Sequence, residues 1–204
     1  MLKRLVWKEH DLYSIQLKND LYILAQLLHK PYVAFFNIQS NIGDFTDEQL
    51  DLIQTEPLGV CCVLKDFIKT CAERKITATY APNLHIQLPE LFISEDPEQW
   101  MQRSSIADVA RIYNLVHIDP LLGDQGILTN PIQVRDIQNN APDCWDRYEL
   151  VGHNTGYELI RRLLLSIQHG QWIDPEKEKR RTGSDPYPLQ TLSELWAAGV
   201  PRYK

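Results

Sequence analysis

Alternating apolar and polar positions near the start of the chain predict a β-hairpin. Residues 11–17 alternate and place three apolar side chains on one face, and residues 21–28 form a second apolar run after a short polar turn. Pro31 interrupts the pattern, and residues 32–38 are then rich in aromatic and branched side chains, which favour a third strand. Three consecutive strands joined by short turns indicate an antiparallel sheet.

Later segments predict further strands and then helices. A continuous apolar run at 58–64 is typical of a buried strand, and residues 76–80 favour another strand. Helical spacing and capping pairs predict helices at 47–54, 66–74, 105–115, 156–169 and 174–181, and a last one that begins after Thr191. Residues 117–142 are rich in Pro, Gly, Asn and Asp, which predicts a long irregular connection.

The order of these elements indicates an α+β fold. Strands dominate before residue 90 and helices after residue 100, without strict alternation. We expect a twisted antiparallel N-terminal sheet or an SH3-like barrel with helices, followed by a mainly helical C-terminal half. The predicted division is a β-rich N-terminal domain, 1–98, and a mainly helical region, 99–204, packed on it. A chain of 204 residues is long enough to bury a sizeable core.

Charged residues are distributed unevenly along the chain, which bears on what the chain could bind. The formal net charge is −6, and no Lys or Arg occurs between Lys30 and Lys65. This stretch carries five acidic residues: Asp44, Asp47, Glu48, Asp51 and Glu56. Such a surface would repel a phosphate backbone and attract a cationic partner, although a solvated acidic loop is the plainer interpretation.

Cysteines and histidines give no motif for a metal or a cofactor. The four cysteines include no CxxC pair, and the six histidines include no HExxH motif. We interpret the cysteines as buried apolar side chains in a reducing compartment, and we expect no cofactor and no metal. The longest apolar runs are too short to span a bilayer, so we expect a cytoplasmic protein that has no membrane segment or secretion signal.

Two alternatives to a binding protein remain open. An enzyme could use Cys144 and His153, with the helix that begins at Gly156, although no GxSxG motif is present. The turn at 152–156 could also bind a small anion at a helix N-terminus, with Arg161 and Arg162 one turn further on.

The second alternative is a nucleic-acid-binding module. Residues 177–181 contain four basic side chains but include Glu178, and a helix of mixed sign is more typical of a solvated face. We therefore expect no direct contact with nucleic acid.

The first half of the chain resembles a bacterial family, immunity protein 26. The resemblance covers about residues 5–95 and rests on spaced hydrophobic segments: DLYSIQL at 11–17, the run at 21–28, FFNI at 35–38, PLGVCCVLK at 57–65 and LPELF at 88–92. The chain departs from the family pattern at His10, where the family has Gly, and at Lys75 and Ile76, where it has Trp. Proteins of this family protect a bacterium by binding a toxin, so the resemblance implies binding and no catalytic residue.

The leading hypothesis is therefore an immunity protein and not an enzyme. It would bind and neutralise a cationic toxin domain, a nuclease, in contact-dependent inhibition between bacteria. The predicted partner-binding residues are the five acids of the base-free stretch: Asp44, Asp47, Glu48, Asp51 and Glu56.

Overall fold

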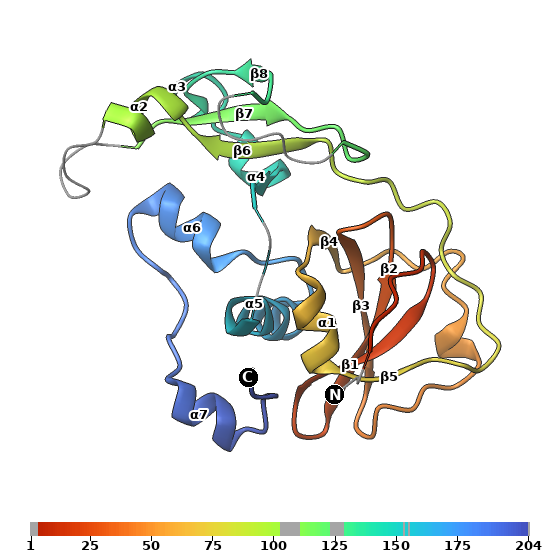
Figure 1. The fold of residues 1–204 in the computed structure, drawn as a ribbon. Coiled ribbons are helices and arrows are strands. Elements are labelled where there is room, and N and C mark those ends of the chain that lie inside the picture. The colour runs from red at the N-terminus through yellow and green to blue at the C-terminus, as the bar shows by residue number, and fades with distance from the viewer. Residues whose placement is uncertain (1–3, 103–110, 123–128, 153, 155, 204) are drawn as a thin grey trace.

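The computed structural model describes residues 4–102, 111–122, 129–152, 154 and 156–203, and its ribbon is drawn in Figure 1. Its strands are β1 (Leu12–Lys18), β2 (Leu21–Leu27), β3 (Tyr32–Ser40), β4 (Gly59–Cys62), β5 (Ala72–Lys75), β6 (Leu91–Glu95), β7 (Tyr113–His117), β8 (Ile132–Val134) and β9 (Glu149–Leu150). Its helices are the 3-10 turn η1 (Glu48–Leu50), α1 (Lys65–Cys71), α2 (Pro97–Gln102), α3 (Ile137–Asn140), α4 (Cys144–Arg147), α5 (Gly156–His169), α6 (Pro175–Thr182) and α7 (Leu192–Ala197).

The first sheet has five antiparallel strands in the order β4-β3-β2-β1-β5. The predicted hairpin and third strand are confirmed: Ile15 pairs with Ile23, and Ala25 pairs with Phe35. The sheet is open, with β4 and β5 at its two edges, so the alternative prediction of an SH3-like barrel is wrong. After β4 the chain turns directly into α1, and Val63 bridges to Asn154 instead of continuing toward β5.

Both faces of the first sheet are covered, which explains why its strands are apolar on both sides. One face, with Ile15 and Phe35, packs against α1 and against the apolar stripe of α5. The opposite face, with Leu24 and Phe36, packs against irregular segments and the second sheet. The first sheet is therefore the central layer of the molecule.

The second sheet has four strands in the order β8-β7-β6-β9, and only the β6–β9 pair is parallel. Phe92 and Val116 point toward the first sheet, whereas Ile93 and Leu115 pack under α3 and α4. Trp145 of α4 closes that outer core. Because successive side chains of a strand point to opposite faces, this short sheet contributes side chains to two hydrophobic cores.

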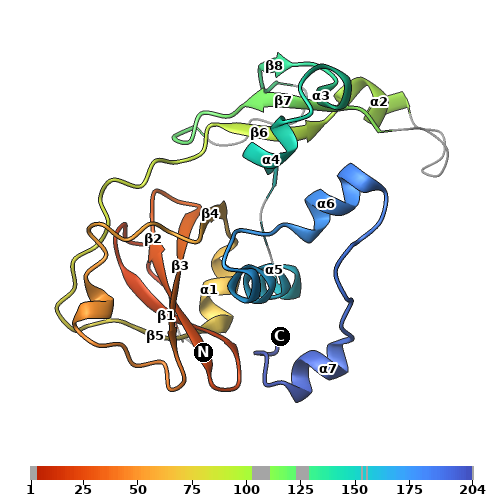
Figure 2. The same ribbon diagram turned by 180° about the vertical axis from the view of Figure 1, so that it is seen from behind.

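The C-terminal region is mostly helical, as predicted. Helix α5 lies next to α1, on the face of the first sheet that α1 also covers, and the chain then passes through α6 and returns as α7 (Figures 1 and 2). The tail reaches the β1–β2 turn, where the Asn19 N–H donates to the Ala198 carbonyl at 2.9 Å. The chain ends therefore lie on the same side of the molecule.

Three local predictions are wrong. The helix expected at 47–54 is reduced to η1, because the backbone of Leu50 and Leu52 bonds to Ala81 instead of continuing a helix. The strand expected at 76–80 has no regular structure. The last part of the helix expected at 105–115 is instead the start of strand β7, which pairs along its whole length with β6. Residues 105–110 of this expected helix lie outside the described residues.

Two further boundaries shift. The helix expected at 66–74 ends at Cys71, where β5 begins, and β8 and α3 lie within the connection expected at 117–142. The division at residue 98 stays a prediction; strands β6 and β7 lie on either side of it and pair with each other. Within the described ranges, no helix is long and apolar enough to cross a membrane.

Gly59 of β4 gives a test of how the C-terminal region packs on the first sheet. A Cβ atom at this position would overlap the indole ring of Trp172, which also stacks on Phe35 with ring centroids 6.5 Å apart. We expect Gly59→Ala to lower the free energy of unfolding in urea by about 1–3 kcal/mol, because overpacking forces the ring or the strand to move.

The same substitution in a Trp172→Leu background is the matched control. There we expect Gly59→Ala to cost much less, since the smaller side chain leaves room for the methyl group. An equal cost in both backgrounds would contradict this packing.

Candidate functional site

The five predicted partner-binding acids are all solvent-exposed and lie in one segment, residues 44–56, which we call the acidic loop. Asp44 forms an ion pair with Arg74 of β5. The other four, Asp47, Glu48, Asp51 and Glu56, have no ion-pair partner in the part of the chain that the structure describes. The acidic loop therefore presents four uncompensated carboxylates to solvent.

Local hydrogen bonds fix the start of the acidic loop. The Thr46 N–H donates to Gln49 Oε1 at 2.9 Å, and the Gln49 N–H points back to Thr46 Oγ1 at 3.4 Å, which is the predicted capping box. Leu50 and Leu52 are buried and anchor the loop to the first sheet. Asp51, between these two leucines, and Glu48, at the start of η1, remain exposed.

A second segment without Lys or Arg lies beside the acidic loop. Residues 76–102 contain none, and their acids are Glu90, Glu95, Asp96 and Glu98. The Leu52 N–H donates to the Ala81 carbonyl at 2.8 Å, and the Ala81 N–H donates to the Leu50 carbonyl at 3.1 Å. In Figure 1 this segment runs past the orange η1 turn on its way to β6. The fold thus places the part of this segment around Ala81 beside the acidic loop, which sequence spacing alone does not reveal.

Asn83 ties these two segments to the sheet. Its side-chain amide donates to the Thr55 carbonyl at 3.1 Å, and its backbone exchanges two hydrogen bonds with the fully buried Gln26 side chain. Two large apolar side chains are exposed in this region, Ile53 at 45% and Leu84 at 63%. The surface that these two segments form therefore combines a hydrogen-bonded backbone with exposed carboxylates and exposed apolar side chains.

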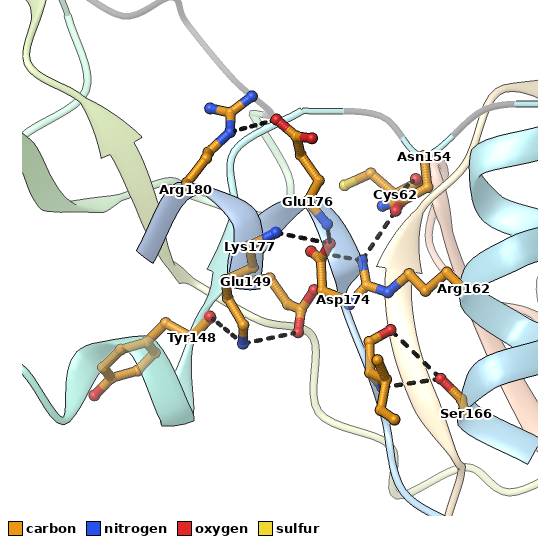
Figure 3. Close-up of polar contacts among 11 residues, drawn as sticks. Cys62, Tyr148, Glu149, Asn154, Arg162, Ser166, Asp174, Glu176, Lys177 and Arg180 are labelled. Atoms are coloured by element: carbon orange, nitrogen blue, oxygen red, sulfur yellow. Dashed lines mark hydrogen bonds and ion pairs between the residues drawn. The ribbon is translucent and has the colours of Figure 1, made fainter. Parts of the chain in front are cut away.

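A buried group of charges around Arg162 is the second polar centre of the molecule, and we call it the Arg162 cluster (Figure 3). Arg162 Nη2 donates to Glu149, Nη1 donates to Asn154 Oδ1 at 2.9 Å, and Nη1 lies 3.2 Å from Asp174 Oδ2. Lys177 Nζ lies 3.9 Å from Glu149 Oε1 and donates to the Tyr148 carbonyl at 3.1 Å. Two cations thus meet two carboxylates inside the protein.

The cluster keeps Arg162 charged although its side chain is 3% exposed. Burial by itself lowers the pKa of this guanidinium, but the carboxylates of Glu149 and Asp174 outweigh burial and raise the pKa above its usual value. Asp174 also caps α6, because its Oδ1 accepts the N–H groups of Glu176 and Lys177. One carboxylate therefore serves both the ion pair and the helix end.

The Arg162 cluster joins elements that are distant in sequence. The Asn154 N–H donates to the Cys62 carbonyl at the end of β4 at 2.8 Å, and the Arg162 guanidinium lies 4.2 Å from the Trp172 ring centroid. Glu149 comes from β9 of the second sheet. No sequence pattern predicts this cluster, because its charged partners are scattered over residues 149–177.

At the anion site predicted for residues 152–156, the two neighbouring arginine side chains contact carboxylates of the protein itself. Arg162 is buried in the cluster, and Arg161 binds both carboxylate oxygens of Asp185 at 2.8 and 3.0 Å. His153 and Thr155 lie outside the described residues. Both arginines are therefore already engaged with carboxylates.

The predicted thiol nucleophile lies in an unfavourable setting. Cys144 is 6% exposed in α4, and burial, followed by the Asp143 carboxylate, raises the pKa of its thiol. Its proposed base, His153, is outside the described residues. None of the four cysteines forms a disulfide bond, and the described ranges contain no group of three His, Cys, Asp or Glu side chains that could hold a metal ion.

The Arg162 cluster yields a stability prediction. We expect Arg162→Met to lower the free energy of unfolding by about 3–5 kcal/mol at neutral pH, because Glu149 and Asp174 lose their main counter-charge inside the protein. Denaturant unfolding at neutral pH measures this loss.

Arg181→Met is the matched control, because Arg181 pairs with Asp146 on the surface and should change stability by less than about 1 kcal/mol. An Arg162→Met deficit no larger than this control would show that the cluster does not hold the fold.

The Arg161–Asp185 pair predicts a dependence on acid. Its hydrogen bonds lower the pKa of Asp185 below the ordinary value of 3.8. A lowered folded-state pKa contributes stability in full above the unfolded value, and this stability is lost as the pH falls through the folded value. Asp185→Asn should therefore cost about 1–3 kcal/mol at neutral pH and progressively less below pH 3.8.

Asp66→Asn, at an exposed carboxylate 3.8 Å from Lys69, is the control and should show little cost at any pH. An Asp185→Asn deficit of the same size at neutral pH and at about pH 3 would contradict the assignment.

Comparison with known proteins places the chain in a family. The searches of curated proteins and of solved structures give no match. One family model, described as Domain of unknown function (DUF8309), matches residues 2–181, a stretch that contains the acidic loop and the whole Arg162 cluster. The match covers most of the 204 residues. The chain therefore belongs to the family Domain of unknown function (DUF8309).

Proposed function

We propose that this protein is an immunity protein that binds and neutralises a cationic bacterial toxin domain, a nuclease, in the cytoplasm. The proposed contact surface is the acidic loop with its five exposed acids: Asp44, Asp47, Glu48, Asp51 and Glu56. The proposal is one of binding and includes no catalytic step.

The observation that carries the proposal is the set of four exposed carboxylates without an ion-pair partner in the described ranges: Asp47, Glu48, Asp51 and Glu56. A partner that binds them breaks no internal ion pair. A nuclease needs cationic side chains where it holds the phosphate backbone, and such a surface is complementary to clustered carboxylates. Electrostatic complementarity of this kind raises the association rate of the complex.

The fixed backbone of the acidic loop also favours binding. The bonds from Leu50 and Leu52 to Ala81, and from Asn83 to Thr55, hold the loop before a partner arrives. A preorganised surface loses less conformational entropy on association than a flexible one.

Apolar side chains complete the proposed interface. Ile53 and Leu84 are exposed and lie on the two segments that Asn83 and Ala81 join. Interfaces commonly combine an apolar centre with a polar rim, and buried apolar anchors supply affinity while charges supply rate and specificity. The resemblance of residues 5–95 to the immunity protein 26 family supports the same class of function.

Charge reversal tests the surface. The partner is the C-terminal domain encoded by the gene immediately upstream, mixed with this protein in a stopped-flow instrument at low salt. The triple variant Asp47→Lys, Glu48→Lys and Asp51→Lys should slow association by about tenfold or more, because long-range steering is lost. The difference should fall as salt is added.

The control variant reverses three exposed acids elsewhere: Asp66→Lys, Glu73→Lys and Asp143→Lys. It has the same net charge as the test variant, so it separates a local from a global charge effect. Equal slowing by both variants would remove the acidic loop from the interface. No complex of the unaltered protein at micromolar concentrations would contradict the proposed function itself.

A further inference from the structure

A cavity of about 440 Å³ is lined by residues of α5, of α6 and of the segment that leads to α7. Residues of β9, of both helices and of this connecting segment line it, and no residue of the acidic loop does. Its volume lies within the range of small-molecule sites, roughly 300–1,000 Å³.

The charged side chains around the cavity are balanced, four basic and four acidic. Six of them form three pairs: Arg161 with Asp185, Arg162 with Asp174, and Arg180 with Glu176. Glu158 and Lys179 remain, and neither has a hydrogen bond or an ion pair from its side chain to any described residue. Among the described residues, the cavity therefore offers one carboxylate and one ammonium group that no hydrogen bond or ion pair engages; the charge of Lys179 also contributes to the lowered pKa of Asp185.

The two free charges come from different elements. Glu158 lies in the first turn of α5, and Lys179 lies near the end of α6. Both side chains are exposed, so a ligand can reach them without disrupting a core. A ligand that carries both a cationic and an anionic group would satisfy both.

Exposed leucines at the same cavity are a second, independent observation. Leu189 is 77% exposed and Leu192 is 47% exposed, and both line the cavity together with the half-buried Leu150. Large apolar side chains left exposed around a concave site are typical of a surface that a ligand covers.

We propose that this cavity binds a small zwitterion with an apolar side chain, a free hydrophobic amino acid or a dipeptide, whose ammonium group meets Glu158 and whose carboxylate meets Lys179. The apolar side chain would contact Leu189 and Leu192 and remove their surface from water. This site is separate from the acidic loop and does not depend on the proposed function.

The connecting segment covers the site. Residues 183–191 have no regular structure, and Arg161 holds them through Asp185 and through the carbonyls of Tyr187 and Pro188 at 3.0 and 3.3 Å. This cover lies beyond residue 181, where the family match ends. The leucines at 189 and 192 thus belong to this chain's own C-terminal segment.

The site is tested by calorimetry of the thermal unfolding of the whole protein, in the presence of L-leucine and of L-leucyl-L-leucine. We expect a melting temperature that rises with the concentration of at least one of them. Leucinamide, which lacks the carboxylate, and 4-methylvalerate, which lacks the ammonium group, should bind at least about tenfold more weakly.

Variants locate the binding. Glu158→Gln and Lys179→Met should each weaken binding by about tenfold, whereas Glu178→Gln and Lys65→Met, which lie outside the cavity lining, should not change it. The proposal is overturned if neither zwitterion raises the melting temperature. It is also overturned if leucinamide binds as tightly as leucine, or if the cavity variants bind as well as their controls.

Discussion

The structure depends on one buried interaction, the guanidinium of Arg162 held between the carboxylates of Glu149 and Asp174. It connects the second sheet, α5 and the start of α6, and the neighbouring Asn154 extends it to the end of β4. A buried ion pair gains little over an apolar contact, but removing one partner is costly, because the other charge is left without compensation. The Arg162 cluster therefore has more effect on how the two sheets are joined than on the stability of each sheet by itself.

The molecule treats its charges in two ways. Around α5 and α6, carboxylates and basic side chains are matched in pairs, and two of these pairs join α5 to the residue before α6 and to the segment after it. In the acidic loop, four of the five carboxylates form no ion pair with a described residue, and buried Leu50 and Leu52 and the bonds to Ala81 fix the backbone. Charges that the fold does not need are available to a partner, and this contrast is why we propose the acidic loop as the contact surface.

The sequence predicted those parts whose pattern is local. The hairpin, β3, α5 and α6 follow from periodicity and capping, and the exposure of the five acids follows from their type. It failed where tertiary pairing overrides local preference, as in β7, which pairs with β6, and at η1, whose backbone bonds to Ala81. The Arg162 cluster and the base-free neighbour of the acidic loop could not be predicted, because each joins residues far apart in the chain.

The most direct test of the central claim is a calorimetric titration of the C-terminal domain encoded by the gene immediately upstream, with the nuclease activity of that domain followed in the same samples. The account predicts tight one-to-one binding and loss of activity at the equivalence point. No heat of binding at micromolar concentrations, or a complex that retains full nuclease activity, would contradict it.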